Sequence, residues 1–235
     1  MIQIDHISKS FEKQAVLKDL SILVPGKTIT CLLGPSGSGK TTLIRLIMGA
    51  ISPDQGSIRI DGTEVPDRRL LGRIGFMPQG DCLYDNLTAS QNLAFFGRLY
   101  GLDKKDLSSR IEESLSLVGL EKESGKLVKK YSGGMKKRLS LAIAVLGHPD
   151  VLILDEPTVG IDPVLRRRIW RHFQQWRDEG KTLLVSTHVM DDVTECDRAI
   201  VLSEGRFIAD DTVSALISRT STGKIEDLFF DNSRQ

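Results

Sequence analysis

The sequence predicts an α/β fold, in which a core with a mostly parallel β-sheet is joined by an N-terminal antiparallel β subdomain and an inserted helical subdomain. Three observations support this prediction. The apolar runs "VLILD" (151–155) and "TLLVST" (182–187) are typical of strands buried on both faces of a parallel sheet. The N-terminal "MIQIDHI" alternates apolar and polar residues, as antiparallel strands with one solvated face do. Between residues 85 and 147 the apolar residues recur at helical spacing instead.

The first sixty residues are expected to form strands separated by turns. The alternation of "MIQIDHI" returns in "SIRIDG", and Gly26 and Pro53 mark turns between such segments. The apolar run "ITCLL" (29–33) ends at a glycine-rich loop, and the stretch after the loop places Leu43 and Ile47 on one helical face. This order of strand, glycine loop and helix is the context of a phosphate-binding loop.

The middle of the chain is expected to be helical. Thr88 and Gln91 have the spacing of a capping box, which begins a helix. Further on, Leu139, Ile143 and Leu146 form one helical stripe. We therefore predict a helical subdomain that interrupts the α/β core.

The core is expected to resume after this helical part. Asp162 is expected to cap a helix that has Pro163 in its first turn and ends at Gly180. These elements predict a single domain with two subdomains. The domain is predicted to span residues 1–235. The core with the antiparallel β subdomain is expected at about 1–84 and 148–235, and the helical subdomain at about 85–147.

The composition is that of an ordinary globular protein. The net charge is +1, so no global field attracts nucleic acid. Arg166–Arg168 and Lys136–Arg138 are consecutive, so they fan around a helix instead of forming one basic stripe, and we expect no nucleic-acid partner. Cys31, Cys82 and Cys196 lack the spacing of a zinc site or a disulfide framework. No apolar run approaches the ~18–20 residues that span a bilayer.

The glycine-rich loop reads "GPSGSGKTT" and contains the pattern G-x-x-x-x-G-K-[ST]. Backbone N–H groups of such a loop close around phosphate oxygens, and the helix that follows adds its positive dipole. Lys40 is placed to reach the β and γ phosphates of a nucleotide, and the Thr41 hydroxyl is placed for Mg²⁺. The pattern predicts a P-loop NTPase core. The nucleotide-binding residues expected here are Gly34, Pro35, Ser36, Gly37, Ser38, Gly39, Lys40, Thr41 and Thr42.

Two acidic residues lie at the end of the run "VLILD". Asp155 ends this predicted strand, where a carboxylate can hold a metal ion, and Glu156 follows, where it can polarise an attacking water. Taken alone, such a pair would more often be two solvated acids at a strand exit. The phosphate loop favours the catalytic interpretation.

A second glycine-rich helix start reads "YSGGMKKRLSLA" (131–142). Each glycine at the start of a helix costs ~1 kcal/mol of helix propensity. That cost indicates a close approach of a ligand to the backbone, and a phosphate is the obvious candidate. As an isolated feature, a flexible cap would be the commoner explanation.

With this motif the chain resembles the ATP-binding cassette (ABC) family, the motor subunits of ABC transporters, over almost its whole length. Phe11 lies where the family has an aromatic residue that stacks on adenine, and residues 34–42 match the Walker A loop. Gln79 matches the Q-loop glutamine, and Asp162 matches the D-loop. Joint occurrence at family spacing is more specific than any one motif.

The remaining family motifs follow in the expected order. Residues 131–135 match the signature motif, residues 151–156 match the Walker B strand with its glutamate, and His188 matches the switch histidine. The resemblance implies ATP and Mg²⁺ as ligands. It implies that Glu156 activates water, that His188 contacts the γ-phosphate, and that Gln79, Thr41 and Asp155 surround the metal.

The resemblance also implies partners. The signature residues Ser132, Gly133 and Gly134 of a second copy, or of a paralogous cassette, would close over the ATP, with Asp162 beside them. The site would then be complete only in a dimer that sandwiches two ATP. Such a dimer moves a solute only through a separate membrane-spanning permease, so the chain would be cytoplasmic, held on the inner face of the cell membrane by that permease.

The departures from the family pattern indicate a branch. Phe11 stands where tyrosine is commoner and keeps the ring face. The signature reads Tyr131-Ser-Gly-Gly-Met135, which keeps the phosphate-facing groups and loses one side-chain amide. This form, with "TVGIDP", resembles the ABC-2-type exporter branch, which includes drug-resistance and antibiotic-efflux pumps. An importer, a cassette ATPase acting on DNA or ribosomes, and a non-catalytic scaffold remain as alternatives.

An apolar stretch follows Gln79. The family's coupling contact with the permease lies just after the Q-loop, and one interpretation is that some of these side chains line a docking groove there. The alternative is that all six pack inward. The six residues are Leu83, Tyr84, Leu87, Phe95, Phe96 and Tyr100.

Overall fold

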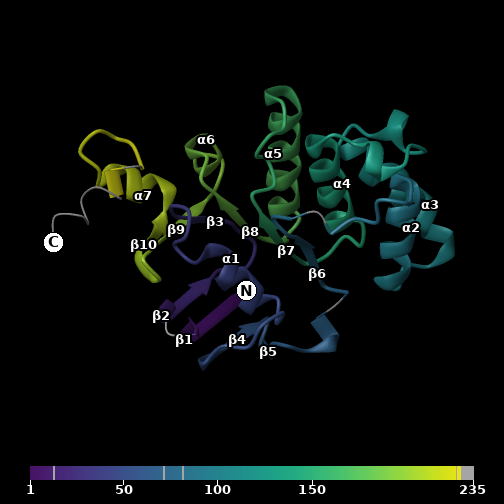
Figure 1. The fold of residues 1–235 in the computed structure, drawn as a ribbon. Helices are drawn as coiled ribbons and strands as arrows, with labels where there is room; N and C mark the ends of the chain where they lie inside the picture. Colours follow the sequence, from purple (N-terminus) through teal and green to yellow (C-terminus); the bar gives the residue numbers. More distant parts are fainter. Residues whose placement is uncertain (13, 71, 81, 226, 229–235) are drawn as a thin grey trace. The chain divides into compact units, whose positions relative to one another are not determined.

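The computed structural model describes residues 1–228 apart from 13, 71, 81 and 226. The chain forms two compact units, which we describe separately. Unit 1 combines Met1–Arg68 with Thr182–Gln235, and unit 2 is Arg69–Lys181. Figure 1 gives the element labels used below.

The first sheet of unit 1 is antiparallel and four-stranded, in the order β2-β1-β4-β5 (Figure 1). Ile2, Ile4 and Ile7 of β1 are buried, which is why this alternating sequence covers a core on one face. Register shifts between β1 and β2 interrupt the strict alternation after Ile4. The strands are β1 (Ile2–Phe11), β2 (Gln14–Val24), β4 (Gln55–Ile60) and β5 (Thr63–Glu64).

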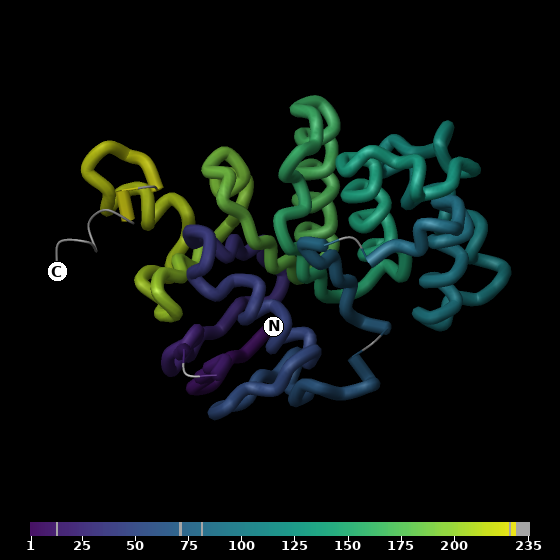
Figure 2. The backbone as a smooth tube through the Cα atoms, viewed as in Figure 1, coloured from purple at the N-terminus to yellow at the C-terminus, as the bar shows by residue number. Residues whose placement is uncertain are grey.

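The core strands of unit 1 are mostly parallel. Strand β3 pairs with β8 and with β9 in parallel, and β10 pairs with β9 as an antiparallel hairpin, which the tube in Figure 2 traces near the end of the chain. All residues of β3 and β8 are buried, as the continuous apolar runs predict. The strands are β3 (Ile29–Leu33), β8 (Thr182–Thr187), β9 (Arg198–Ser203) and β10 (Arg206–Thr212).

Three of the α-helices that the structure describes belong to unit 1. Helix α1 buries Leu43, Ile44 and Ile47, the face that the sequence pattern predicts. Two shorter helices follow the later strands. The helices are α1 (Lys40–Ile47), α6 (Met190–Val193) and α7 (Val213–Ser218).

Within its described residues, unit 2 contains two parallel strands and four α-helices, which are labelled in Figure 1. Strands β6 (Ile74–Met77) and β7 (Val151–Asp155) pair, and the first three helices lie between them in the sequence. The helices are α2 (Ala89–Leu99), α3 (Lys104–Leu117), α4 (Gly133–Val145) and α5 (Pro163–Asp178). Short 3₁₀ segments complete the connections, at η1 (Arg68–Leu70), η2 (Glu121–Glu123) and η3 (Val128–Lys130).

Local chemistry explains where these helices begin. Thr88 and Gln91 form the predicted capping box at the start of α2. Asp162 caps α5 by accepting a hydrogen bond from the backbone N–H of Leu165 at 3.0 Å, with Pro163 in the first turn.

The predicted fold class is confirmed, because both units contain parallel strands, unit 1 contains the antiparallel β sheet, and the helices α2 to α4 lie between two strands of unit 2. The subdomain boundaries near residues 84 and 148 stay a prediction. Within the described residues, every helix is too short or too polar to cross a bilayer.

Candidate active site

The glycine loop of unit 1 connects β3 to α1, as the sequence predicts. Gly39 is the N-cap of α1 with φ 108°, a conformation that favours glycine. A Cβ on Gly34 would lie 2.3 Å from the carbonyl oxygen of Leu202, so only glycine fits at the loop's entry. The loop is therefore tightly built at both ends, while residues 35–37 between them are exposed.

Two polar side chains of the loop are buried. The Lys40 ammonium donates hydrogen bonds to the carbonyl oxygens of Gly34 at 2.6 Å and Pro35 at 3.0 Å. The Ser38 hydroxyl has no hydrogen-bond partner among the described residues. A buried polar atom without a partner is costly, so this hydroxyl fits a site that a ligand oxygen completes. Together with the first N–H groups of α1, these groups suit phosphate oxygens.

His188 follows β8 at the edge of the sheet where the glycine loop follows β3. Leu33 and Thr187 are partners across these parallel strands, and each precedes its functional segment by one residue. The Thr187 hydroxyl donates to the buried Asp192 carboxylate at 3.2 Å and accepts from the Val189 N–H at 2.9 Å. Thr187 and Asp192 therefore hold the backbone beside an exposed His188, a supporting role that sequence motifs did not reveal.

Phe11 lies at the end of β1 in unit 1 and is exposed. The Lys9 ammonium lies 5.6 Å from the centroid of its ring and also pairs with Asp54 at 2.7 Å. The exposed ring can accept an aromatic base, and the nearby cation adds positive charge beside it.

Unit 2 contains the two acidic residues that the sequence predicts for the site, Asp155 and Glu156. Asp155 is buried at the end of β7, and Glu156 follows with φ 53°, a left-handed conformation that costs about 1–3 kcal/mol for a non-glycine residue. Such strain is commonly found at functional sites. Met77 of β6 pairs with Leu154 of β7, so Asp155 ends one strand and Gln79 follows the end of the neighbouring strand.

The described residues contain no group of three or more His, Cys, Asp and Glu side chains that could hold a metal ion. Asp155 offers one carboxylate at the end of β7, and proteins usually bind Mg²⁺ through one or two carboxylates together with substrate phosphates.

The signature segment begins helix α4 in unit 2. Ser132 is its N-cap and accepts from the Met135 N–H at 3.3 Å. A Cβ on Gly133 would meet nothing within 4 Å, so the backbone there is open to a ligand. A Cβ on Gly134 would lie 3.4 Å from the carbonyl oxygen of Gly160, near the D-loop.

The segment after Gln79 carries an exposed aromatic cluster. The rings of Tyr84 and Phe95 contact edge to face, with their centroids 4.8 Å apart. The ring of Phe96 extends the cluster, with its centroid 5.3 Å from that of Phe95. Tyr84 is 48% exposed, Phe95 42% and Leu99 68%. The alternative in which all six apolar residues of this stretch pack inward is therefore wrong.

Asn92 positions this segment, which the sequence did not indicate. Its buried side chain accepts from the Tyr84 N–H at 2.9 Å and donates to the carbonyl oxygens of Tyr84 at 3.1 Å and Thr88 at 3.0 Å. Asp85 pairs with Lys136 of the signature helix at 2.9 Å. The Val128 N–H donates to the Leu87 carbonyl at 2.9 Å. An ion pair and a backbone hydrogen bond therefore connect the segment that carries the aromatic cluster to residues around the signature motif.

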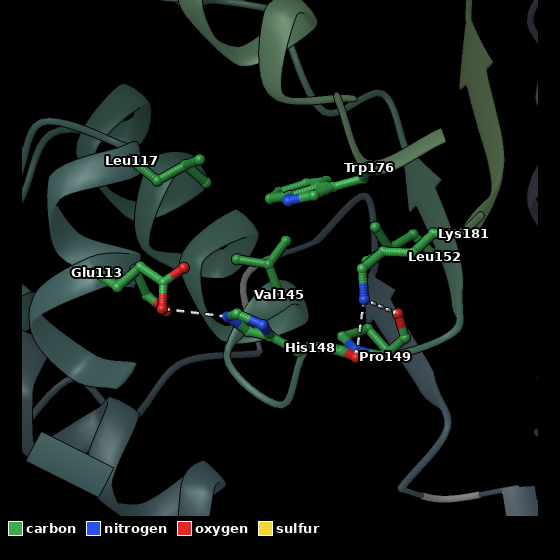
Figure 3. A pocket seen from close by; sticks show the side chains of 9 residues that line it. Glu113, Leu117, Val145, His148, Pro149, Leu152, Trp176 and Lys181 are labelled. Carbon is green, nitrogen blue, oxygen red and sulfur yellow. Dashed lines mark hydrogen bonds and ion pairs between the residues drawn. The ribbon is translucent and has the colours of Figure 1, made fainter. Parts of the chain in front are cut away.

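A small cavity of about 20 Å³, room for one water molecule, also lies in unit 2. Figure 3 shows the Trp176 ring beside its apolar lining. Glu113 pairs with His148 at 3.1 Å, and Lys181 donates to the carbonyl oxygens of His148 and Pro149, both at 3.0 Å. Its size excludes a nucleotide.

The predicted site residues divide between the units. Unit 1 contains Phe11, residues 34–42 and His188, and unit 2 contains the others. The described structure brings the glycine loop and His188 to one sheet edge, and Gln79 and Asp155 to another pair of strand ends.

Comparison with known proteins identifies the family of this chain. The family model described as ABC transporter matches residues 17–159. Nod factor export ATP-binding protein I of Paraburkholderia xenovorans (strain LB400) is 40% identical over 220 residues, which cover 92% of this chain and 72% of that protein. The linearmycin resistance ATP-binding protein LnrL of Bacillus subtilis (strain 168) is 36% identical over 222 residues, covering 93% and 71%.

Solved structures give the same result. The structure of an ATP-binding subunit of an ABC transporter superposes with a TM-score of 0.89 at 27% identity, covering 98% of each chain. The dimeric structure of MJ0796, a bacterial ABC transporter cassette, has a TM-score of 0.84 at 25% identity and covers 90% of this chain and 98% of that one. The predicted family is confirmed: the chain belongs to the ABC transporter family as an ATP-binding and ATP-hydrolysing subunit, similar to proteins named for export and drug resistance.

Proposed function

We propose that this chain hydrolyses MgATP to power the export of a solute, such as a drug, an antibiotic or a lipid, through a separate membrane-spanning permease. The observation that carries the proposal is the glycine loop, with its buried Lys40 ammonium and unpartnered Ser38 hydroxyl. The names of the relatives, Nod factor export and linearmycin resistance, support export over import. The chain would be cytoplasmic, on the inner face of the cell membrane.

Each site residue has a proposed task at the phosphates. Lys40 moves from the carbonyl oxygens of its own loop to the β and γ phosphates, and the Ser38 hydroxyl completes its hydrogen bonding there. Glu156 orients and deprotonates the attacking water, and His188 contacts the γ-phosphate. Thr41, Asp155 and Gln79 would hold Mg²⁺, which when bound neutralises charge on the phosphate oxygens.

We propose that a second copy, or a paralogous cassette, completes the site. Gly133 has open space above its backbone, which is what a phosphate from another chain's loop requires. Ser132 and Asp162 would contact the same nucleotide. The dimeric cassette structure similar to this chain supports such an assembly.

The exposed aromatic cluster is the proposed docking surface for the permease. Tyr84, Phe95 and Leu99 present apolar area to solvent, a property that commonly marks an interface. Asp85 connects this surface to the signature helix through Lys136. Movement of the signature helix on ATP binding would therefore reach the permease.

Inside-out membrane vesicles that contain the assembled transporter test the direction and the coupling. We expect ATP-dependent accumulation of solute inside such vesicles, together with phosphate release. Accumulation only in right-side-out vesicles would show an importer. If the native chain purifies under mild detergent without any membrane protein, a soluble cassette ATPase would be favoured.

A further inference from the structure

A broad, open groove of about 830 Å³ lies on unit 2, and its lining is rich in arginine. Arg138 comes from α4 and Arg167, Arg168 and Arg171 from α5. The lining contains one carboxylate, that of Asp162, which caps α5. The groove is therefore strongly cationic although the whole chain carries a net charge of only +1.

Two of these arginines bind the end of α3. The Arg138 guanidinium donates to the carbonyl oxygens of Val118 at 3.1 Å and Gly119 at 3.2 Å. Arg168 donates to the carbonyl oxygen of Ser116 at 2.6 Å. These contacts satisfy carbonyl groups that a helix C-terminus leaves without partners, so the fold accounts for both residues.

The other two arginines have no such task. Arg167 and Arg171 are exposed, and neither forms a hydrogen bond or an ion pair with any of the residues that the structure describes. They are four residues apart on α5, so their side chains lie one turn apart on the same helix face. The groove thus offers two guanidinium groups, each able to bind a carboxylate through two parallel hydrogen bonds.

The shape and the apolar lining limit the ligand. Small molecules bind in concave sites that bury most of their surface, whereas this groove is open. Val164 beside the arginines is 83% exposed, so the surface combines an aliphatic side chain with positive charge. An acidic peptide segment with aliphatic side chains matches both properties, because it supplies carboxylates at side-chain spacing and apolar contact between them.

We propose that this groove binds an acidic segment of a partner polypeptide, in which two carboxylates one helical turn apart pair with Arg167 and Arg171 and an aliphatic residue covers Val164. The proposal does not depend on ATP hydrolysis or transport, because the groove residues that carry it take no part in the proposed phosphate site.

Fluorescence anisotropy with a labelled peptide tests the proposal on the full chain. The probe is a helical peptide of EAAL repeats, and its control has QAAL repeats. We expect binding of the glutamate peptide that weakens as salt rises, and roughly two- to thirtyfold weaker binding of the glutamine peptide, which lacks both ion pairs. Arg167→Glu with Arg171→Glu should abolish binding, and Arg167→Lys with Arg171→Lys should weaken it, since lysine keeps the charge without the planar fork.

The matched control is Lys104→Glu with Lys105→Glu, which changes net charge equally at the other end of α3, about 20 Å from the groove by helix length. The control should bind the glutamate peptide as tightly as the unchanged chain does. Equal binding by this control and by Arg167→Glu with Arg171→Glu would overturn the proposal, and so would equal binding of the two peptides.

Two other outcomes would assign the groove to a different partner. Binding of phosphatidylglycerol vesicles that depends on Arg167 and is tighter than binding of the peptide would assign the groove to a lipid surface. Loss of MgATP-dependent self-association in the arginine variant would assign it to a second copy.

Discussion

Leu33 and Thr187 are partners in register across the parallel strands β3 and β8. The residue after each of them begins a segment that we propose for the phosphate site, the glycine loop at Gly34 and the predicted switch histidine at His188. Because both strands end at the same sheet edge, the fold delivers Lys40 and His188 from positions far apart in the sequence to one side of unit 1.

Replacing Lys40 with alanine should weaken MgATP binding by about 10- to 100-fold, since a charge-assisted hydrogen bond contributes roughly 1.5–3 kcal/mol. Turnover should be abolished. Titration with a fluorescent ATP analogue measures the affinity. Arg45→Ala, on the exposed face of the same helix, is the control and should bind normally. Normal affinity in the Lys40 variant would remove Lys40 from the site.

Glu156→Gln should separate binding from hydrolysis, because the amide keeps the shape but cannot accept the proton. We expect phosphate release to fall by about 10²–10⁴-fold and ATP-dependent dimers to persist. Light scattering with and without MgATP detects the dimers. Glu112→Gln, on an exposed part of α3, should behave as the unchanged chain does. Hydrolysis at the normal rate by Glu156→Gln would contradict its assignment as base.

Mixing Ser132→Arg protein with Lys40→Ala protein should restore part of the ATPase activity that each lacks alone. In the mixed dimer, one site keeps an intact glycine loop from one chain and an intact signature segment from the other. Phosphate release at varied mixing ratios measures the recovery. If mixed dimers form and show no recovery, the site is completed within one chain.

Cys82 reports on the proposed docking surface, because it is exposed while Cys31 and Cys196 are buried. A maleimide should label Cys82 readily in the free chain and slowly in the assembled transporter. Equal labelling in both states would place the permease elsewhere.

Charge at the same surface should uncouple transport from hydrolysis. Leu83→Glu or Tyr84→Glu should reduce vesicle transport while the basal ATPase of the free chain stays normal. Leu23→Glu, at an exposed apolar residue of unit 1, is the control and should transport normally. Normal transport by both Glu variants would contradict the docking proposal.

The pKa of His172 is lowered mainly by burial and further by Arg168, while Glu113 opposes the shift. Because the unfolded chain binds this proton more readily, the free energy of unfolding should fall as pH drops from about 6.5 through the folded pKa. His172→Gln should flatten that part of the stability curve in urea titrations. By NMR, Arg168→Gln should raise the pKa of His172 and Glu113→Gln should lower it; shifts of the opposite sign would refute this explanation.

The sequence by itself determined the local elements and predicted the nucleotide chemistry of the site. Continuous apolar runs predicted β3, β7 and β8, and the Thr88–Gln91 box and Asp162 predicted the starts of α2 and α5, because these signals act between residues that are close in the chain. The pattern around Lys40 predicted nucleotide binding for the same reason.

Only the tertiary structure decided which distant residues support one another. Three such contacts involve residues outside any motif. They are the hydrogen bond of Thr187 to Asp192, the hydrogen bonds of Asn92 to the segment 84–88, and the ion pair of Asp85 with Lys136. The sequence predicted Arg166–Arg168 to fan around a helix, but it could not show that α3 would engage Arg168 and leave Arg167 and Arg171 exposed beside Val164. Such relationships depend on how elements pack, and packing brings together residues whose separation in the chain carries no periodic signal.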